Sequence, residues 1–310
     1  MRVLVLTGAV GDLSPAQAGR VVASPWAAAG HAVAVVPMTA DGNGLDDAVA
    51  ALGPGRATVV RQTGGTTTGP LGEAAARAIA AGASTVLLDL TQPLPVDGGA
   101  GLLAALGATA AAPLDAGPVF GYLGQVRLPS LPARLVAVVA AGTETAPLLG
   151  VRGVAATAGF ESGQDRAEVL ALDAALARLA AAVGLPDPPA GAGSGQGAAL
   201  AVLALGGAVQ TAPAALAELV DLDRSLALAD LLVVVTDALD FGGAGVPLAQ
   251  AAAGWAATAG APCIVVARAV QISSRELRTL GIESAYGLTG DEGDAGLAEL
   301  AQRVARTWSW

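Results

Sequence analysis

The sequence contains no lysine, because all sixteen of its basic residues are arginines. This excludes a Schiff base, an amine general base and a phosphate-loop lysine, so any phosphate would have to be bound by arginine, backbone N–H groups, a helix N-terminus or a metal ion. One cysteine, Cys263, and one histidine, His31, also exclude an internal disulfide and a zinc site built from these two residue types alone. Cys263 lies in an apolar, strand-like run and His31 follows a glycine, so we expect a buried cysteine and a turn histidine rather than a catalytic pair.

Cationic surface and long hydrophobic runs are missing too. The formal net charge is −10 and the pI is about 4.5, whereas nucleic acids and anionic lipids are bound by dense cationic patches. The longest apolar stretch, from Ala198 to Val209, falls short of the roughly 20 residues that span a bilayer. The apolar N-terminal run ends at Gly8, too early for a secretory signal. We therefore expect a soluble, cytoplasmic protein that binds neither nucleic acid nor membrane.

Strand-like runs alternate with alanine-rich segments of helical length, which is typical of parallel strands joined by crossover helices. Apolar residues make up 54% of the 310 positions, enough to bury a large core. Continuous apolar runs indicate strands buried on both faces, so the sequence predicts an α/β protein with a doubly wound, mostly parallel sheet of flavodoxin-like or Rossmann-like type. The predicted strands are Arg2–Leu6, His31–Val36, Thr85–Leu90, Leu135–Val139, Leu231–Val235, Pro262–Ala267 and Glu283–Tyr286. The predicted helices include Pro15–Ala29, Gly98–Gly107, Arg166–Val183, Pro247–Ala259 and Ala295–Thr307.

Two stretches rich in glycine, proline and threonine interrupt this alternation. Residues 56–73 indicate a strand that leads into a turn, and residues 186–197 indicate a flexible loop before a helix at Ala198–Leu205. We therefore predict a main lobe of residues 1–55, 75–183 and 219–310, with a reduced second lobe of residues 56–74 and 184–218 inserted into it. In such sheets ligands bind at the carboxyl ends of the strands.

Short motifs shared with one protein family follow one another along nearly the whole chain. They are Asp41-Gly42, Thr68-Gly69-Pro70-Leu71-Gly72, Asp97-Gly98-Gly99-Ala100-Gly101, Pro147-Leu148-Leu149-Gly150, Gly191-Ala192-Gly193, Leu239-Asp240 and Leu280-Gly281-Ile282. In this order they resemble the bacterial glycerate kinases of the two-lobed α/β type. The resemblance implies the glycerate kinase fold and, as the family activity, transfer of a phosphoryl group from ATP to glycerate with Mg²⁺.

The polar positions of the family's ligand loops depart from that pattern. Thr7-Gly8-Ala9-Val10-Gly11 replaces a loop that carries a lysine. Pro93 and Pro95 stand in the segment that reads GGSATN in the family, and they remove backbone N–H donors that could bind phosphate. Glu161 and Ser162 replace the glutamine and lysine of FGPQKG. Phosphoryl transfer depends on positioning and charge neutralisation, so these losses predict a weakened reaction.

Acidic and arginine residues near predicted strand ends are the candidate replacements. The candidate catalytic residues are Asp97, Asp240 and Arg268; the candidate substrate- or nucleotide-binding residues are Asp41, Gly42, Gly98, Gly99, Thr236 and Asp237; and the candidate Mg²⁺ ligands are Asp237 and Asp240.

Each candidate also has a structural alternative. Arg268 either binds an anion or pairs with a carboxylate such as Asp237, because buried charges are normally neutralised. Asp237 and Asp240 either bind a metal or cap a helix, and capping is favoured slightly. Gly98 and Gly99 either form an anion-binding helix N-terminus or allow close packing.

Three functions are compatible with this pattern. The first hypothesis is a glycerate-kinase-like protein with weak or lost phosphotransferase activity and a binding or regulatory role, whose partner is a small organic acid, a nucleotide or a protein. The second is an active ATP- and Mg²⁺-dependent kinase of glycerate or a related hydroxy acid; the third is another reaction on a nucleotide or sugar acid. A second copy of the chain, in a homo-oligomer, is a further candidate partner. At the C-terminus, Trp308 and Trp310 either form a docking surface or fold back onto the domain.

Overall fold

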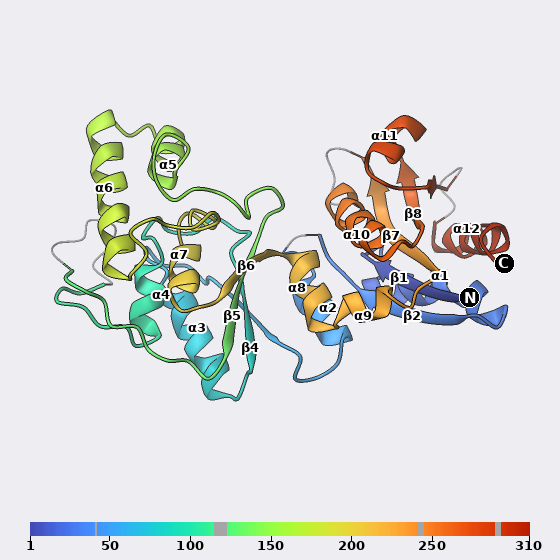
Figure 1. Ribbon diagram of the computed structural model, residues 1–310, viewed down its shortest axis with the longest axis horizontal. Helices are drawn as coiled ribbons and strands as arrows, with labels where there is room; N and C mark the ends of the chain where they lie inside the picture. Colours follow the sequence, from blue (N-terminus) through green and yellow to red (C-terminus); the bar gives the residue numbers. More distant parts are fainter. Residues whose placement is uncertain (41, 115–122, 241–244, 289–292) are drawn as a thin grey trace. The chain divides into compact units, whose positions relative to one another are not determined.

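The computed structural model describes residues 1–40, 42–114, 123–240, 245–288 and 293–310. The chain divides into two compact units, shown in Figure 1. Unit 1 consists of Met1–Pro54 and Ala212–Trp310, and unit 2 consists of Gly55–Thr211. Each unit contains its own parallel sheet.

Unit 1 is built on five parallel strands in the order β2-β1-β7-β8-β9. Val3 and Val5 of β1 pack with Val233 of β7 and with the buried residues of α1 and α12, including Trp26. Helix α10 contacts β7 and β8, and its buried residues lie outside this cluster, so it covers the other face of the sheet. The strands are β1 (Arg2–Thr7), β2 (Ala32–Pro37), β7 (Leu231–Leu239), β8 (Cys263–Val270) and β9 (Ser284–Tyr286); the helices are α1 (Pro15–Ala28), α2 (Leu45–Ala51), α8 (Ala212–Leu219), α9 (Leu222–Leu226), α10 (Gly245–Ala259), α11 (Ser274–Thr279) and α12 (Gly293–Thr307).

Unit 2 is built on four parallel strands in the order β3-β4-β5-β6. Its core joins Val86 and Leu88 of β4 and Leu135 of β5 to apolar side chains of helices α3, α4, α6 and α7. The strands are β3 (Thr58–Arg61), β4 (Thr85–Asp89), β5 (Arg134–Val139) and β6 (Ala208–Thr211); the helices are α3 (Gly69–Ala80), α4 (Ala100–Ala105), α5 (Val154–Ser162), α6 (Arg166–Ala182) and α7 (Ala199–Ala204).

Local sequence explains where the long helices begin. Ser14 accepts a hydrogen bond from the Gln17 backbone N–H while the Gln17 side chain bonds back to the Ser14 N–H, a capping box that starts α1. Asp165 and Glu168 form the same reciprocal pair at the start of α6. These caps satisfy N–H groups that have no partner within a helix.

The predicted α/β class with parallel strands is confirmed, but the predicted division into lobes is wrong. Strands β4 and β5 pair with β3 and β6 in unit 2 rather than with the strands of unit 1. Residues 75–183 therefore belong to unit 2, which is a complete unit with its own sheet and core and not a reduced insertion. The apolar pattern of a strand shows that it is buried, but it does not show which strand lies beside it.

Two smaller predictions concern the C-terminus and the bilayer. Trp308 folds back, since its indole N–H donates a hydrogen bond of 2.8 Å to the Tyr286 hydroxyl, whereas Trp310 keeps 67% of its surface exposed. Among the described residues no helix combines the length and apolar character needed to cross a membrane.

Candidate functional site

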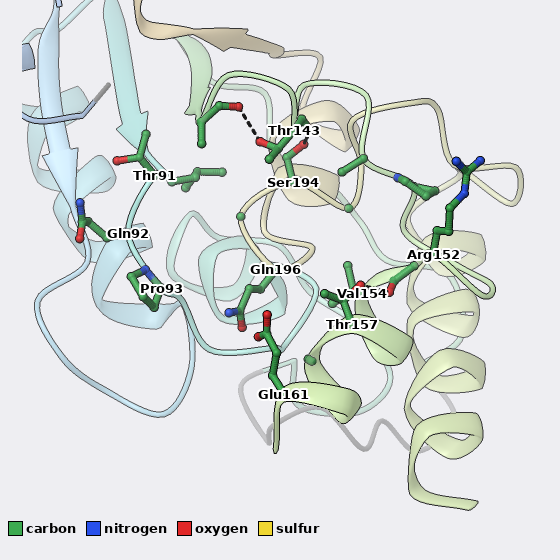
Figure 2. A pocket seen from close by; sticks show the side chains of 18 residues that line it. Thr91, Gln92, Pro93, Thr143, Arg152, Val154, Thr157, Glu161, Ser194 and Gln196 are labelled. Carbon is green, nitrogen blue, oxygen red and sulfur yellow. Dashed lines mark hydrogen bonds between the residues drawn. The ribbon is translucent and has the colours of Figure 1, made fainter. Parts of the chain in front are cut away.

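Unit 2 contains a cavity of about 430 Å³ at the carboxyl ends of its central strands. Leu90 and Thr91 follow β4, Ala140 follows β5, and one face of α5 forms another wall. The polar side chains that line it include Thr91, Gln92, Thr143, Arg152, Glu161, Ser194 and Gln196 (Figure 2). Parallel α/β sheets bind ligands at this position, and several convergent polar groups in a concave site are typical of small-molecule binding.

A glycine-rich loop closes one side of the cavity. The Gly191 and Gly193 N–H groups both donate to the Ala146 carbonyl, at 3.2 and 3.0 Å, and the Ser194 hydroxyl donates to the Thr143 carbonyl. A Cβ at Gly193 would lie 2.1 Å from the Pro147 carbonyl oxygen, so only glycine fits there. The segment predicted as a flexible loop is therefore held against the strand ends by backbone hydrogen bonds.

A buried carboxylate fixes the rim of the cavity at the end of β4. Asp89 accepts hydrogen bonds from the Arg61 Nε at 2.8 Å, the Thr91 N–H at 3.0 Å and the Thr91 hydroxyl at 2.6 Å. The Asp89 side chain is 1% exposed, so its charge is offset by Arg61 rather than by water. Asp89 could not be predicted as a site residue from the sequence, because a single aspartate at the end of a strand belongs to no motif.

The predicted catalytic residue Asp97 is buried between two helix starts. Its carboxylate accepts from the N–H groups of Thr68 (2.7 Å), Gly99 (2.9 Å) and Gly101 (3.2 Å), and from the Thr68 hydroxyl (3.0 Å). Asp97 is only 1% exposed. This geometry gives Asp97 a structural role, joining the first turns of α3 and α4, and offers no support for its predicted catalytic role.

Gly98 and Gly99 serve close packing. Both have positive φ, and a Cβ at Gly99 would lie 2.5 Å from the Ala201 Cβ. The Gly99 N–H already donates to Asp97. The packing alternative therefore accounts for both glycines, and the Gly99 N–H is not free for an anion.

In unit 1, Arg268 of β8 forms a bidentate pair with Asp237 of β7. The Arg268 Nε and Nη2 atoms each lie 2.8 Å from a carboxylate oxygen of Asp237, and the Gly11 N–H donates to the same carboxylate at 2.8 Å. The hydrogen bonds from Arg268, together with the Gly11 N–H, hold the pKa of Asp237 below its ordinary value. Of the two alternatives for Arg268, the carboxylate pair is the one observed. The capping alternative for Asp237 is wrong, because this residue lies within a strand.

Comparison with known proteins places these features in a family. The sequence profile described as the glycerate kinase family matches residues 16–308. The chain belongs to the glycerate kinase family. A crystal structure described as that of a "putative glycerate kinase 2" from Salmonella typhimurium LT2 superposes on it with a TM-score of 0.75 at 19% identity, covering 99% of this chain and 98% of that one. That similarity shows a shared fold.

Two curated relatives of this glycerate kinase family member are uncharacterized proteins of Mycobacterium bovis and Mycobacterium tuberculosis. Each is 32% identical over 235 residues, which is 74% of this chain. The match spans 57% of the length of each relative.

Two of the candidate carboxylates in this family member are already bound by groups of the protein. The Asp237 carboxylate is already bound by Arg268 and Gly11, and that of Asp97 is bound by backbone N–H groups. No three histidine, cysteine, aspartate or glutamate side chains within the described part of the chain are grouped so as to hold a metal ion. The metal role of Asp237 stays a prediction, and it competes with the observed pair with Arg268.

The remaining predicted residues that the structure describes lie in unit 1. Thr236 is buried within β7, near Gly245 of α10. Asp240 directly follows β7, is half-buried and interacts with another group of the protein. Gly42 is buried before α2, and Asp41 lies outside the described residues. The catalytic and metal roles of Asp240 stay predictions.

Proposed function

We propose that this chain is a glycerate-kinase-like protein with weak or lost ATP:glycerate phosphotransferase activity, which binds a small organic acid in the cavity of unit 2. Binding without efficient turnover would suit a regulatory role towards a protein partner in the cytoplasm. Membership of the glycerate kinase family supports the ligand class, and the chemistry of the cavity supports the reduced activity.

The observation that carries this proposal is the lining of the cavity. Its polar groups are mainly hydroxyls and amides, with Arg152 as the one cationic side chain among the described lining residues. Pro93 stands in the wall, in a segment that also contains Pro95, and neither proline has a backbone N–H to donate to a phosphate. A triphosphate requires several cations or N–H donors, whereas a single carboxylate can be bound by one arginine and a few hydroxyls.

The other candidate groups for phosphoryl transfer are committed elsewhere. Asp97 holds two helix starts together, and Arg268 is neutralised by Asp237. Loss of one transition-state donor typically lowers a rate by about a hundredfold or more. Loss of several supports a reaction far slower than the turnover of about 1–100 s⁻¹ that is typical of kinases.

The test is a thermal-shift and calorimetric titration with D-glycerate and with Mg·ATP, separately and together. A ligand at 100 times its Kd stabilises the native state by about 2.7 kcal/mol, which is readily detected. We expect D-glycerate or a related organic acid to bind, Mg·ATP to bind weakly, and phosphoglycerate formation to be at least about a hundredfold below kinase rates. Turnover at ordinary kinase rates would contradict the proposal.

The second candidate function is an active kinase of glycerate or a related hydroxy acid that uses Mg²⁺ and ATP. It is favoured by one observation, the family match and shared fold along nearly the whole chain. In that case Asp240 and Arg268 would act in substituted roles. If turnover is found, Arg268→Ala and Asp240→Ala should each abolish it; activity that survives both substitutions would refute this assignment of residues.

A further inference from the structure

Helix α5 gives the cavity of unit 2 two ends of opposite charge. Val154, Thr157, Ala158 and Glu161 all line the cavity, and their spacing places them on one face of the helix. Arg152 lines it just before the first turn of α5, and Glu161 lies in the last turn. In Figure 2 the Glu161 carboxylate points into the cavity towards Gln196, well away from Arg152.

The helix itself reinforces this separation of charge. The N-terminus of a helix carries partial positive charge and its C-terminus partial negative charge, so the Arg152 end favours an anion and the Glu161 end favours a cation. The nine residues of α5 extend roughly 13 Å at 1.5 Å per residue. A ligand that contacts both ends must therefore be elongated.

Glu161 is exposed and lies in the last turn of α5. A carboxylate in the last turn of a helix is opposed by the helix dipole, and a lysine or arginine partner would normally offset this. Among the described residues no ion pair involves Glu161 or Arg152.

We infer that Glu161 is a specificity-determining residue that selects a zwitterionic organic acid, with its carboxylate at the Arg152 end of the cavity and an ammonium or guanidinium group at the Glu161 end. The inference rests on the proposed function, because it assumes that the cavity binds an organic acid. The apolar surface of Pro93, Pro147 and Val154 lies in the same cavity and suits the carbon chain between the two charged groups. The same carboxylate repels a second anionic group on the ligand.

The test uses three probes of similar length in calorimetric titrations of the full chain. They are 10-aminodecanoate, which is zwitterionic, decanoate, which lacks the ammonium group, and decanedioate, which has a second carboxylate. We expect the natural sequence to bind 10-aminodecanoate at least about tenfold more tightly than decanoate, and decanedioate more weakly than decanoate. The near-isosteric variant Glu161→Gln should bring the three affinities to within about twofold of one another.

Glu73→Gln is the matched control, since it removes the same charge from an exposed position in α3 of unit 2, outside the cavity. It should keep the natural order of affinities. Equal affinities for the three probes in the natural sequence, or an unchanged order in Glu161→Gln, would overturn the inference while leaving organic-acid binding intact. Failure of all three probes and of D-glycerate to bind would overturn the inference and the proposed function together.

Discussion

Replacing Asp97 with asparagine separates a structural role from a catalytic one. The carboxylate accepts from three buried backbone N–H groups and one hydroxyl. An asparagine side chain has one acceptor oxygen and presents an NH₂ group in place of the other. At least one N–H group, from Thr68, Gly99 or Gly101, must then lose its acceptor. An unsatisfied buried donor costs about 1–3 kcal/mol, and bonds to a charged acceptor are the stronger ones, so we expect Asp97→Asn to destabilise unit 2 by about 2–4 kcal/mol.

The four tryptophans allow this change to be assigned to one unit. Trp26, Trp255, Trp308 and Trp310 all belong to unit 1, so tryptophan fluorescence reports on unit 1. In a urea titration the far-UV circular dichroism of Asp97→Asn should show a transition at lower urea than that of the natural sequence. Hydrogen exchange should quicken in peptides from residues 68–106.

The matched control is Asp187→Asn, which alters an exposed aspartate of the same unit and should shift stability by less than about 0.5 kcal/mol. If Asp97→Asn unfolds at the same urea concentration as the natural sequence, the hydrogen-bond argument is refuted. If its stability is unchanged while a measurable phosphotransfer rate falls, Asp97 is catalytic after all.

Three further outcomes are expected. Arg268 holds the pKa of Asp237 below its ordinary value, so the unfolded state binds more protons in acid than the folded state does. The stability that this pair contributes is therefore present above about pH 4. It is lost as the pH falls through the pKa of Asp237 in the folded state. Asp237→Asn should therefore flatten the dependence of the urea midpoint on pH between about 5 and 3, by no more than about 1 kcal/mol because the pair is half-exposed; an unchanged slope would contradict the assignment. Burial, with a smaller effect of Glu283, raises the pKa of Cys263 to about 12, so iodoacetamide at pH 8 should add no mass to the native protein but label it in urea. Gly101→Ala should destabilise unit 2 by about 2 kcal/mol or more, because its Cβ would lie 2.5 Å from the Gly69 nitrogen. The control Gly254→Ala adds a methyl group in open space on α10 and should stabilise unit 1 by about 0.5–1 kcal/mol in a fluorescence-detected melt. Equal effects of the two substitutions would show that the packing around Gly101 adapts.

Strands with strong apolar patterns could be predicted from the sequence. The runs around Val3, Leu87, Val136, Val233 and Val265 are all strands in the structure. Their assignment to one sheet was wrong, because the choice of neighbouring strand depends on packing between segments far apart in the chain. The short strand β6 was missed for a related reason, since four residues with mixed polarity give little periodicity.

The candidate site was harder to predict than the fold. The rule that ligands bind at strand ends identified the loop after Leu90, which lines the cavity, but not the loop after Val139, which lines it as well. The residues chosen as catalytic were the acidic members of recognisable motifs, yet Asp97 proved to be bound by backbone donors. Glu161 and Ser194 line the cavity without belonging to any intact motif, so only the packing of α5 and the glycine-rich loop brings them into it.

The path of the chain also sets an order for folding during synthesis. The hydrogen bond between the Arg2 N–H and Asp230 joins residues 228 positions apart, because β1 pairs with β7 across the whole of unit 2. Unit 2 is one continuous segment, so it can complete its sheet as soon as β6 leaves the ribosome. The apolar β1 can pair early with β2, but its other edge stays open until β7 has been synthesised, and an open apolar strand edge is prone to aggregate. Heating the nascent chain or slowing its synthesis before residue 231 should therefore endanger unit 1, while unit 2 is already folded.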